Sequence, residues 1–366
     1  MQGSNMEKRS FLRYIPKEVP TPKFHTLSFK EILSKKPQRQ PLIEGVLDRK
    51  EGVVIVGPHG LGKSLIVNQI CLTVGSPNVF NGLWGRFLIP KPLISVICQS
   101  ENDRAGFYTR LELITQSNSA YLKGQRNVHV IAQENADSPR IRGDLLDVNF
   151  RLALVDKLQE LNADIVVFDP LISFHEIDEN DNTKMRKVLD ALQIHILDVA
   201  NVGAIIPHHP PKGKSNGPRG AGAIGDWAHT IVELTYKDAV QDRYHIRMFN
   251  AKNRNHKEFG TVWLRKTEQL DFLRCKAPLT KKDLDEVDKV VDILTQMGSA
   301  KTKTELVKAI IDGTGIKSEK TARKYIQMAV KHEYIIEEKT GGRGSSMSYH
   351  LPSEVVPPAP EASFLR

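Results

Sequence analysis

The hydrophobic pattern between residues 41 and 276 alternates short apolar runs with longer amphipathic stretches. A bounded apolar run of four to eight residues predicts a buried strand, whereas apolar residues spaced three and four apart predict a helix. We therefore expect strands at 52–56, 93–98, 127–131, 164–169 and 203–207, and helices at 63–74, 104–116, 146–161 and 181–200. Strands that alternate with helices favour an α/β fold with a mostly parallel sheet covered by helices.

The pattern changes at both ends of the chain. Residues 1–40 are polar, basic and interrupted by prolines, and we expect a partly flexible N-terminal arm. Its one predicted helix covers 28–34, where Ser28 can cap and Glu31 follows three residues later. Residues 280–352 have three helical stretches followed by two strands around a turn, the order of a winged helix-turn-helix. Residues 353–366 are proline-rich and are expected to form a disordered tail.

The composition of the 366 residues narrows the class of protein. Hydrophobic residues make up 40% and charged residues 26%, which excludes a wholly disordered or collagen-like chain. We find neither an apolar run long enough for a membrane helix nor a secretory signal, and the three cysteines share no metal-ligand spacing. We therefore expect a cytoplasmic protein with reduced thiols and no membrane partner. The net charge of +9 is compatible with a polyanionic partner.

The most specific motif runs from Gly57 to Ser64 and matches G-x-x-x-x-G-K-[ST] between a predicted strand and a predicted helix. Its backbone N–H groups can surround a phosphate at a helix N-terminus, where the helix dipole favours negative charge. Lys63 would reach the β- and γ-phosphates, and the Ser64 hydroxyl would hold Mg²⁺. ATP and Mg²⁺ are thus the predicted cofactors; the alternative is a glycine-rich turn without a ligand. The predicted nucleotide-binding residues are Gly57, Pro58, His59, Gly60, Leu61, Gly62, Lys63, Ser64 and Leu65.

Two carboxylates follow predicted strands of the same sheet. Asp169 ends the apolar run that starts at Ile165, where it can join Ser64 as a magnesium ligand or simply cap a helix. Glu101 lies just past the strand at 93–98, where it can orient the attacking water or be a surface residue at a helix start. The distance from the P-loop favours the magnesium role for Asp169, whereas the spacing alone leaves both interpretations of Glu101 open.

The order P-loop, strand then Glu, strand then Asp resembles the RecA-like ATPases, specifically hexameric helicases of the DnaB and plasmid RepA type. Three further stretches, 100–111, 219–226 and 250–255, are similar to motifs of that family, and the resemblance covers about residues 42–266. It implies a RecA-like ATPase core, here 41–276, that works as a ring, expected to be a hexamer. Unlike DnaB, the chain has no recognisable primase-binding N-terminal domain, and Asp169 is followed by a proline and no second acid.

The resemblance also implies roles for individual residues. Glu101 falls on the position of the catalytic base, and Lys252 and Arg254 on the pair that reaches a neighbouring subunit's ATP. His208 and His209 resemble the RepA-type pair that senses the γ-phosphate. From the residues alone, Arg254 could be a solvated charge and the histidines could bind a metal, although adjacent side chains in extended backbone point apart.

Basic residues in two regions are candidates for DNA binding. The loop 210–219 offers Lys212, Lys214 and Arg219, and is otherwise a plain solvated loop. The predicted recognition helix at 318–333, capped by Ser318, packs Ala322, Ile326 and Val330 on its core. It presents Lys320, Arg323 and Lys324 outward, and Arg343 lies in the following wing. Winged helices also dock proteins, so a protein partner is the alternative.

These observations favour an ATP-dependent DNA helicase or translocase that replicates a plasmid, phage or other mobile element. Its expected partners are single-stranded or duplex DNA, further copies of itself, and a replication initiator or primase. A second hypothesis is a DNA-binding ATPase without unwinding activity, such as a recombination mediator or transposition regulator. A third is a small-molecule kinase, which would not need Lys252 and Arg254.

Overall fold

The computed structural model describes residues 25–36, 38–77, 82–100, 103–131, 142–210, 221–238, 242–300, 302–339 and 347–352. The chain divides into two compact units, residues 1–40 and 41–366. In the first, helix α1 (Phe29–Lys35) starts after Ser28, whose hydroxyl accepts a hydrogen bond from the Glu31 backbone N–H. The Glu31 carboxylate accepts one from the Ser28 N–H in return. This capping box satisfies two backbone donors at the helix start, as the sequence predicts.

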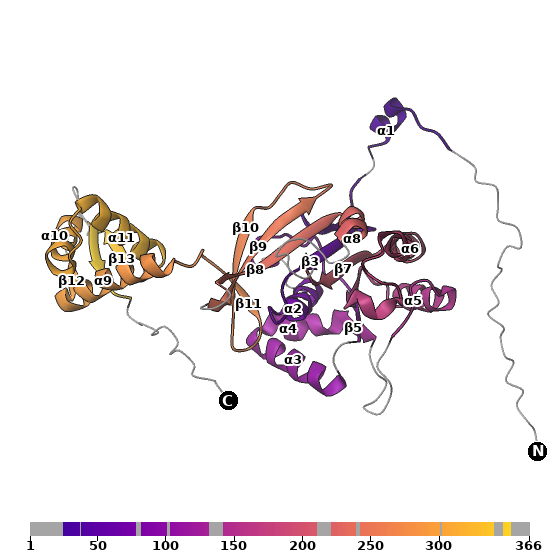
Figure 1. The fold of residues 1–366 in the computed structure, drawn as a ribbon, viewed down its shortest axis with the longest axis horizontal. Coiled ribbons are helices and arrows are strands. Elements are labelled where there is room, and N and C mark those ends of the chain that lie inside the picture. The colour runs from indigo at the N-terminus through magenta and orange to yellow at the C-terminus, as the bar shows by residue number, and fades with distance from the viewer. Residues whose placement is uncertain are drawn as a thin grey trace, which may run out of the picture. The chain divides into compact units, whose positions relative to one another are not determined.

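One large sheet forms the centre of the second unit (Figure 1). Its strand order among the described residues is β11-β10-β9-β8-β3-β7-β6-β4-β5. The six strands from β8 to β5 in this order are parallel, and β9, β10 and β11 continue the sheet antiparallel from β8. The parallel strands are β3 (Gly52–Val56), β4 (Ser95–Gln99), β5 (Val128–Ile131), β6 (Ile165–Asp169), β7 (Gly203–His208) and β8 (Thr230–Asp238). The antiparallel ones are β9 (Asp242–Asn253), β10 (Thr261–Lys266) and β11 (Phe272–Cys275).

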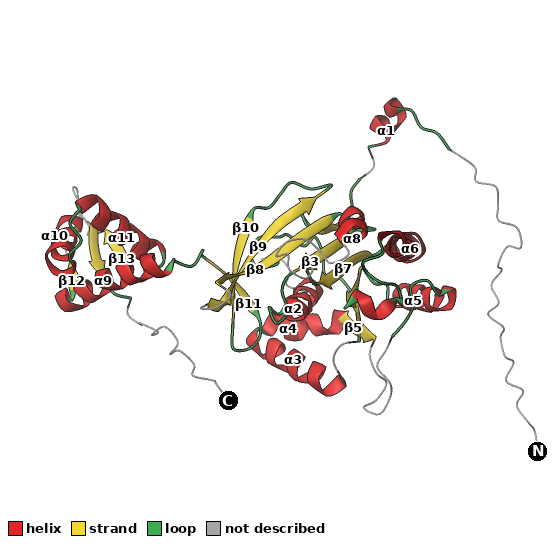
Figure 2. Ribbon diagram, in the orientation of Figure 1, coloured by secondary structure: helices red, strands yellow, loops and turns green. Residues whose placement is uncertain are grey.

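Helices cover both faces of this sheet, as Figure 2 shows. Strand β3 is buried along its whole length, with Val53 and Ile55 in one hydrophobic core and Val54 and Val56 in the other. Alternate side chains of a strand point to opposite faces, so a strand covered on both sides is apolar throughout. The first core is closed by α2 (Lys63–Gly75), α3 (Arg104–Ser117) and α4 (Ser119–Gly124). The second is closed by α5 (Val148–Glu160), α6 (Asn182–Leu192) and α8 (Ala221–Trp227).

The mostly parallel α/β core is therefore confirmed, with one difference in its longest predicted helix. Residues 181–200 form α6, a π-helical turn at Gln193–Leu197 and α7 (Asp198–Ala200) rather than one regular helix. Such a turn accommodates an extra residue and cannot be recognised from a 3.6-residue pattern. A short antiparallel pair, β1 (Pro41–Ile43) and β2 (Leu47–Asp48), precedes β3, and 3₁₀ turns lie at Gln125–Asn127 and Leu171–Phe174. None of the described helices is both long and apolar enough to cross a membrane.

The C-terminal region has a hydrophobic core of its own. Its elements follow the order α9 (Lys281–Met297), β12 (Ser299–Ala300), α10 (Lys303–Thr314), α11 (Glu319–Lys331), β13 (Ile336–Lys339) and β14 (Met347–His350). The three strands form a small antiparallel sheet in the order β12-β14-β13. Leu294, Ile310, Ile326 and Tyr349 are fully buried between the helices and this sheet.

Of the two expectations for α11, the Ser318 cap was wrong and the core-facing residues were confirmed. Ser318 occupies the position before the helix, but its side chain makes no capping hydrogen bond. Tyr325 and Ala329 are buried together with Ala322 and Ile326, whereas Val330 is half-buried. Val330 still packs against the core, so all three predicted residues face it and Tyr325 and Ala329 extend the buried face.

Candidate nucleotide-binding site

The P-loop connects β3 to α2 and needs glycine at two positions. Gly60 has φ +75° and Gly62 has φ +101°, in the left-handed region that other residues rarely adopt. A Cβ atom on Gly62 would also lie 3.1 Å from the Phe272 ring, so a side chain would crowd the strand β11 behind the loop. The glycines of the motif thus fix the path of the backbone around the pocket.

Lys63 is buried at the base of this loop, with 7% of its surface exposed. Its ammonium donates hydrogen bonds to the carbonyl oxygens of Gly57 and Pro58, at 2.8 and 3.0 Å. It also lies 3.0 Å from Nδ1 of His209, which follows the end of β7. The His209 ring stacks on His59 of the P-loop, with 3.6 Å between the ring centroids. One histidine of the predicted pair therefore lies directly beside the phosphate-binding lysine.

Ser64 and Asp169 meet at the mouth of the same loop. The Ser64 hydroxyl donates a hydrogen bond to Oδ1 of Asp169 at 3.1 Å, and Asp169, at the end of β6, is 4% exposed. Mg²⁺ prefers oxygen ligands and commonly uses one carboxylate, a hydroxyl, phosphate oxygens and water. The hydroxyl and carboxylate brought together here fit that donor set.

These residues border a cavity of about 630 Å³, in the range of small-molecule sites. Six predicted P-loop residues line it: His59, Gly60, Gly62, Lys63, Ser64 and Leu65. Asp169, His208 and His209 line it as well. Gly57 and Pro58 contribute through the carbonyl groups that hold Lys63, whereas the Leu61 side chain is 1% exposed and belongs to the hydrophobic core.

Three charged residues that the sequence analysis did not select also line the cavity: Arg110, Glu179 and Lys266. Arg110 lies on α3, Glu179 in the turn before α6, and Lys266 at the end of β10. Burial, and then the nearby Arg110 charge, lower the pKa of Lys266. No local motif marks these residues, because the fold brings them together from separate elements.

The described residues before Glu101 end at Ser100, so Glu101 itself is not described. Residues 101 and 102 lie outside the described residues, so the predicted role of Glu101 stays a prediction. Gln99, at the end of β4, pairs with Asp169, and the Ser100 N–H donates to the Asp169 carbonyl at 3.4 Å. The strand before Glu101 is therefore the direct neighbour of the strand that carries Asp169.

Lys252 and Arg254 lie at the other end of the P-loop strand. The Arg254 N–H donates to the His229 carbonyl, and the His229 N–H donates to the carbonyl of Gly52, the first residue of β3. The Lys252 ammonium donates to the Gly225 carbonyl and the Arg254 guanidinium to the Asp226 carbonyl, both at the end of α8. Burial, followed by the Arg254 charge, lowers the pKa of Lys252. Neither residue is among those that line the cavity.

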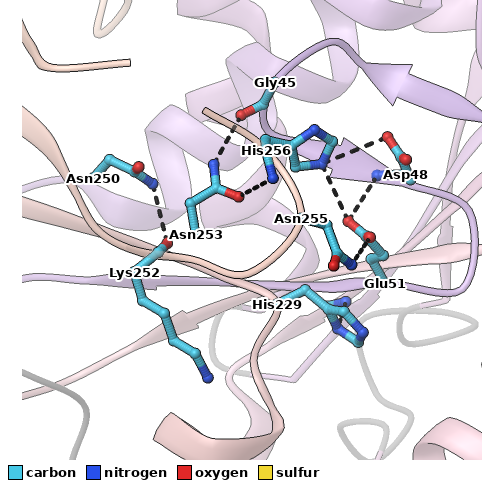
Figure 3. Close-up of polar contacts among 10 residues, drawn as sticks. Gly45, Asp48, Glu51, His229, Asn250, Lys252, Asn253, Asn255 and His256 are labelled. Atoms are coloured by element: carbon cyan, nitrogen blue, oxygen red, sulfur yellow. Dashed lines mark hydrogen bonds and ion pairs between the residues drawn. The ribbon is translucent and has the colours of Figure 1, made fainter. Parts of the chain in front are cut away.

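A group of polar residues around the buried carboxylates of Asp48 and Glu51 holds this segment in place, and we call it the Glu51 cluster (Figure 3). The Asn255 amide donates to Oε1 of Glu51 at 2.6 Å, and the His256 ring lies 3.3 Å from Oε2 of Glu51 and 3.6 Å from Oδ1 of Asp48. Asn253 donates to the Gly45 carbonyl at 3.3 Å. Figure 3 shows Lys252 extending away from this cluster. The segment thus alternates residues anchored to the core with the two cations.

The predicted DNA-binding residues are only partly visible. Lys212, Lys214, Arg219 and Arg343 lie outside the described residues. The α11 cations are at the surface: Lys320 is exposed, Arg323 lies 3.5 Å from Glu319, and Lys324 lies 3.6 Å from Asp283. Exposed ion pairs of this kind contribute about 0–1 kcal/mol, so a phosphate can replace them at small cost.

Two of the three cysteines, Cys71 and Cys98, are buried. Burial raises the pKa of both the Cys71 and the Cys98 thiol to about 12. A thiol must lose its proton to act as a nucleophile. These side chains therefore contribute packing rather than chemistry.

Comparison with known proteins agrees with this geometry. The sequence matches the AAA domain family over residues 18–215, a span that contains the P-loop, Glu101, Asp169 and both histidines. Lys252, Arg254 and the C-terminal region lie beyond the match. No curated protein matches the sequence.

A similar solved structure is the KaiC-like protein PH0186 from the hyperthermophilic archaeon Pyrococcus horikoshii OT3. It is 16% identical, with a TM-score of 0.43, and the match covers 64% of this chain and 94% of that one. A likeness of this size carries no functional argument, so the assignment rests on the family match. That match spans more than half of the sequence and includes the phosphate-binding loop, and the chain therefore belongs to the AAA domain family.

Proposed function

We propose that this chain is an ATP-dependent DNA helicase or translocase that acts as a ring of identical subunits. The observation that carries the proposal is the position of Lys252 and Arg254 relative to the P-loop. The P-loop follows the last residue of β3. Arg254, in contrast, donates a hydrogen bond to His229, which is itself bonded to Gly52, the first residue of β3. A strand rises about 3.3 Å per residue, so the two ends of β3 are roughly 13 Å apart.

In this proposal the pocket binds and orients the nucleotide within one subunit. Lys63 exchanges its backbone carbonyl partners for the β- and γ-phosphates, and the P-loop N–H groups surround the phosphate oxygens. Ser64 and Asp169 would hold Mg²⁺, which would supply positive charge to the phosphate oxygens. Glu101 would orient the attacking water, and His208 and His209 would contact the terminal phosphate.

Hydrolysis would then need a second subunit. Lys252 and Arg254 are displayed together at the edge of the core formed by α8 and the end of β9. Cations supplied to the γ-phosphate from outside stabilise the charge of the transition state, typically by 10³–10⁵-fold in rate. A ring in which each subunit's pair faces the next pocket would couple hydrolysis to assembly.

DNA binding would use the C-terminal region as a winged helix. The order α9, β12, α10, α11, β13, β14 and the three-stranded sheet support that assignment, with α11 as recognition helix. Lys320, Arg323 and Lys324 would contact phosphates of a DNA duplex, Arg343 would extend the contact from the wing, and Lys212, Lys214 and Arg219 would face the strand inside the ring. Replication of a plasmid, phage or mobile element, with an initiator or primase as partner, follows from the resemblance to RepA-type helicases.

The proposal is tested by measuring ATPase rate with and without single-stranded DNA, mass in solution with and without Mg-ATP, and unwinding of a forked duplex. We expect DNA-stimulated hydrolysis, an ATP-dependent ring and directional unwinding. DNA-stimulated hydrolysis and assembly without unwinding would favour the non-helicase DNA-binding ATPase. A monomeric ATPase that ignores DNA would contradict both.

The role of α11 needs a charge-matched control. Replacing Lys320, Arg323 and Lys324 by alanine should weaken duplex binding and reduce the salt dependence by about one unit of slope per lost phosphate contact. The control replaces three other exposed lysines of the same region, Lys281, Lys282 and Lys308. Equal losses in both variants would mean that net charge, rather than α11, determines binding; no loss in either would favour a protein-docking role.

A further inference from the structure

Glu179 is a buried carboxylate in an acidic turn whose other acidic and amide side chains are mostly exposed. The turn runs from His175 to Asp181, and within it Glu176, Asp178 and Asn180 are exposed, whereas Glu179 is 6% exposed. Burying an ionised carboxylate is costly unless charged or hydrogen-bonding groups compensate it. A glutamate turned inward among exposed polar neighbours therefore indicates a specific interaction.

The backbone of the turn determines that inward orientation. The Asp181 N–H donates to the Asp178 carbonyl at 3.0 Å, the Asn180 N–H donates to the Asp178 carboxylate at 2.9 Å, and Asp181 caps α6. On the other side, the Ile177 N–H donates to Nδ1 of the buried His175 at 3.2 Å. Glu179 is thus held between two anchored segments rather than on a free loop.

Glu179 lies beside His208 in the pocket. Oε1 of Glu179 lies 4.0 Å from Nδ1 of His208, whose side chain is 6% exposed. His208 is the last residue of β7, pairs with Val56 and accepts the Gly57 N–H through its carbonyl at 3.3 Å. Both side chains line the cavity that contains Lys63 and Asp169.

We propose that Glu179 is a positioning residue that orients the His208 imidazole and keeps it charged toward the terminal phosphate. The inference rests on the proposed ATP hydrolysis in this cavity. A carboxylate within about 4–6 Å of an imidazole favours its charged form. An imidazolium beside the P-loop adds a positive charge where the γ-phosphate would lie, whereas a neutral ring would not.

Other charged groups also face this cavity, and some favour a charged His208 ring while others disfavour it. Among the described residues they are His59 and Lys63 of the P-loop and α2, Arg110 of α3, Asp169 of β6, His209 after β7 and Lys266 of β10. The cations disfavour a charged His208, and Asp169 favours it. With four or more possible positive charges around the cavity, Glu179 supplies the carboxylate that an imidazolium at His208 requires.

The test compares Glu179→Gln, which keeps the shape and removes the charge, with Glu176→Gln in the same turn. The first readout is the NMR titration midpoint of the His208 ring, identified by its loss in His208→Gln. We expect the midpoint to fall by about one pH unit in Glu179→Gln and to stay unchanged in Glu176→Gln. An unchanged midpoint in Glu179→Gln would overturn the proposal, and this readout does not depend on ATP hydrolysis.

The second readout is the pH dependence of kcat. Because the charged ring would be lost as pH rises, the high-pH decline of kcat should move to lower pH in Glu179→Gln, with roughly tenfold lower kcat at neutral pH and KM within about twofold. In a His208→Gln background the Glu179 change should have little further effect. Full additivity of the two changes would contradict action through His208. If the wild-type chain hydrolyses no ATP, the proposed function fails, while the NMR titration still decides the Glu179–His208 interaction.

Discussion

Lys63 and Arg254 both place a positive charge against backbone carbonyl oxygens, but they do so at opposite ends of β3. Lys63 is 7% exposed and bonds to carbonyls of its own loop, inside the cavity. Arg254 is exposed and bonds to the end of a different element, α8. The first cation completes a site within its own chain, whereas the second is presented outward. In the proposed function, the pocket end of β3 binds the nucleotide, and the Arg254 end would serve a neighbouring subunit.

The Arg254 segment is nevertheless linked by hydrogen bonds to the first residue of β3. Gly52 donates to Nδ1 of His229 at 3.2 Å and accepts from the His229 N–H at 2.9 Å, and His229 accepts from Arg254 at 2.9 Å. A shift of β3 that accompanies nucleotide binding would therefore be transmitted to the Arg254 segment. Each prediction below changes a residue at one of the two ends of β3, or in the pocket beside it.

The largest effect is expected at the pocket end. Lys63→Ala should abolish ATP hydrolysis and strongly weaken Mg-ATP binding, because the β- and γ-phosphates lose their fixed cation. Turnover and nucleotide affinity are measured on the folded variant, with the exposed Lys187→Ala on α6 as control. Unchanged turnover in Lys63→Ala would mean that the phosphates do not bind at this loop.

At the other end, Arg254→Ala should bind nucleotide almost normally and lose on the order of 10³-fold in turnover. The neighbouring exposed residue Lys257→Ala is the control and should retain activity. Mixing Arg254→Ala with Lys63→Ala subunits separates the two ends of β3 directly. Some interfaces then combine an intact P-loop with an intact arginine, and partial recovery of ATPase is expected. Mixed rings that show no recovery at any ratio would mean that Arg254 does not act in trans.

Glu101→Gln should leave ATP binding and assembly intact while hydrolysis slows by at least ~10²-fold, the usual scale for losing a general base. Single-turnover hydrolysis and mass in the presence of ATP measure the two properties separately. Glu112→Gln, exposed on α3, is the matched control. Near-normal turnover in Glu101→Gln would assign the water-orienting role to another group of the pocket.

A smaller effect is expected from the Glu51 cluster. Asn255→Ala removes the hydrogen bond to Glu51 that helps to hold the Arg254 segment. Loss of one such bond costs about 1 kcal/mol, so we expect roughly fivefold slower hydrolysis with unchanged nucleotide affinity. The same assay on Glu258→Ala, an exposed residue of the same segment, should show no change. A loss of nucleotide affinity in Asn255→Ala would instead place this segment in the subunit's own pocket.

The two ends of β3 also differ in how far the sequence predicted them. The P-loop is a contiguous motif whose glycines, lysine and serine determine the geometry locally, and the apolar run before Asp169 predicted that residue's place at a strand end. The sequence did not predict that Arg110, Glu179 and Lys266 line the cavity, because their meeting there depends on how separate elements pack. The Glu51 cluster joins Glu51 to residues about two hundred positions later, a pairing that no spacing rule predicts. Ser318 failed as a cap because residue type gives the preference but not the side-chain rotamer.

The last prediction concerns His229, which links the start of β3 to Arg254. Burial, before all other causes, lowers the pKa of His229, and its Nδ1 accepts the Gly52 N–H, so the neutral ring is the form that fits the fold. The unfolded chain then takes up this proton near pH 6.5, before the folded chain does. Stability that is present above that pH is lost as pH falls through the lowered folded-state value.

His229→Gln keeps an acceptor without a titrating group, so its urea midpoint should decline less between pH 7.5 and 5.5 than the wild type's. Tryptophan fluorescence can follow this, because Trp84, Trp227 and Trp263 all lie in residues 41–276. His175, whose pKa burial also lowers, retains its share of the decline in both proteins, and equal declines would mean that His229 does not couple protonation to the stability of this end of β3.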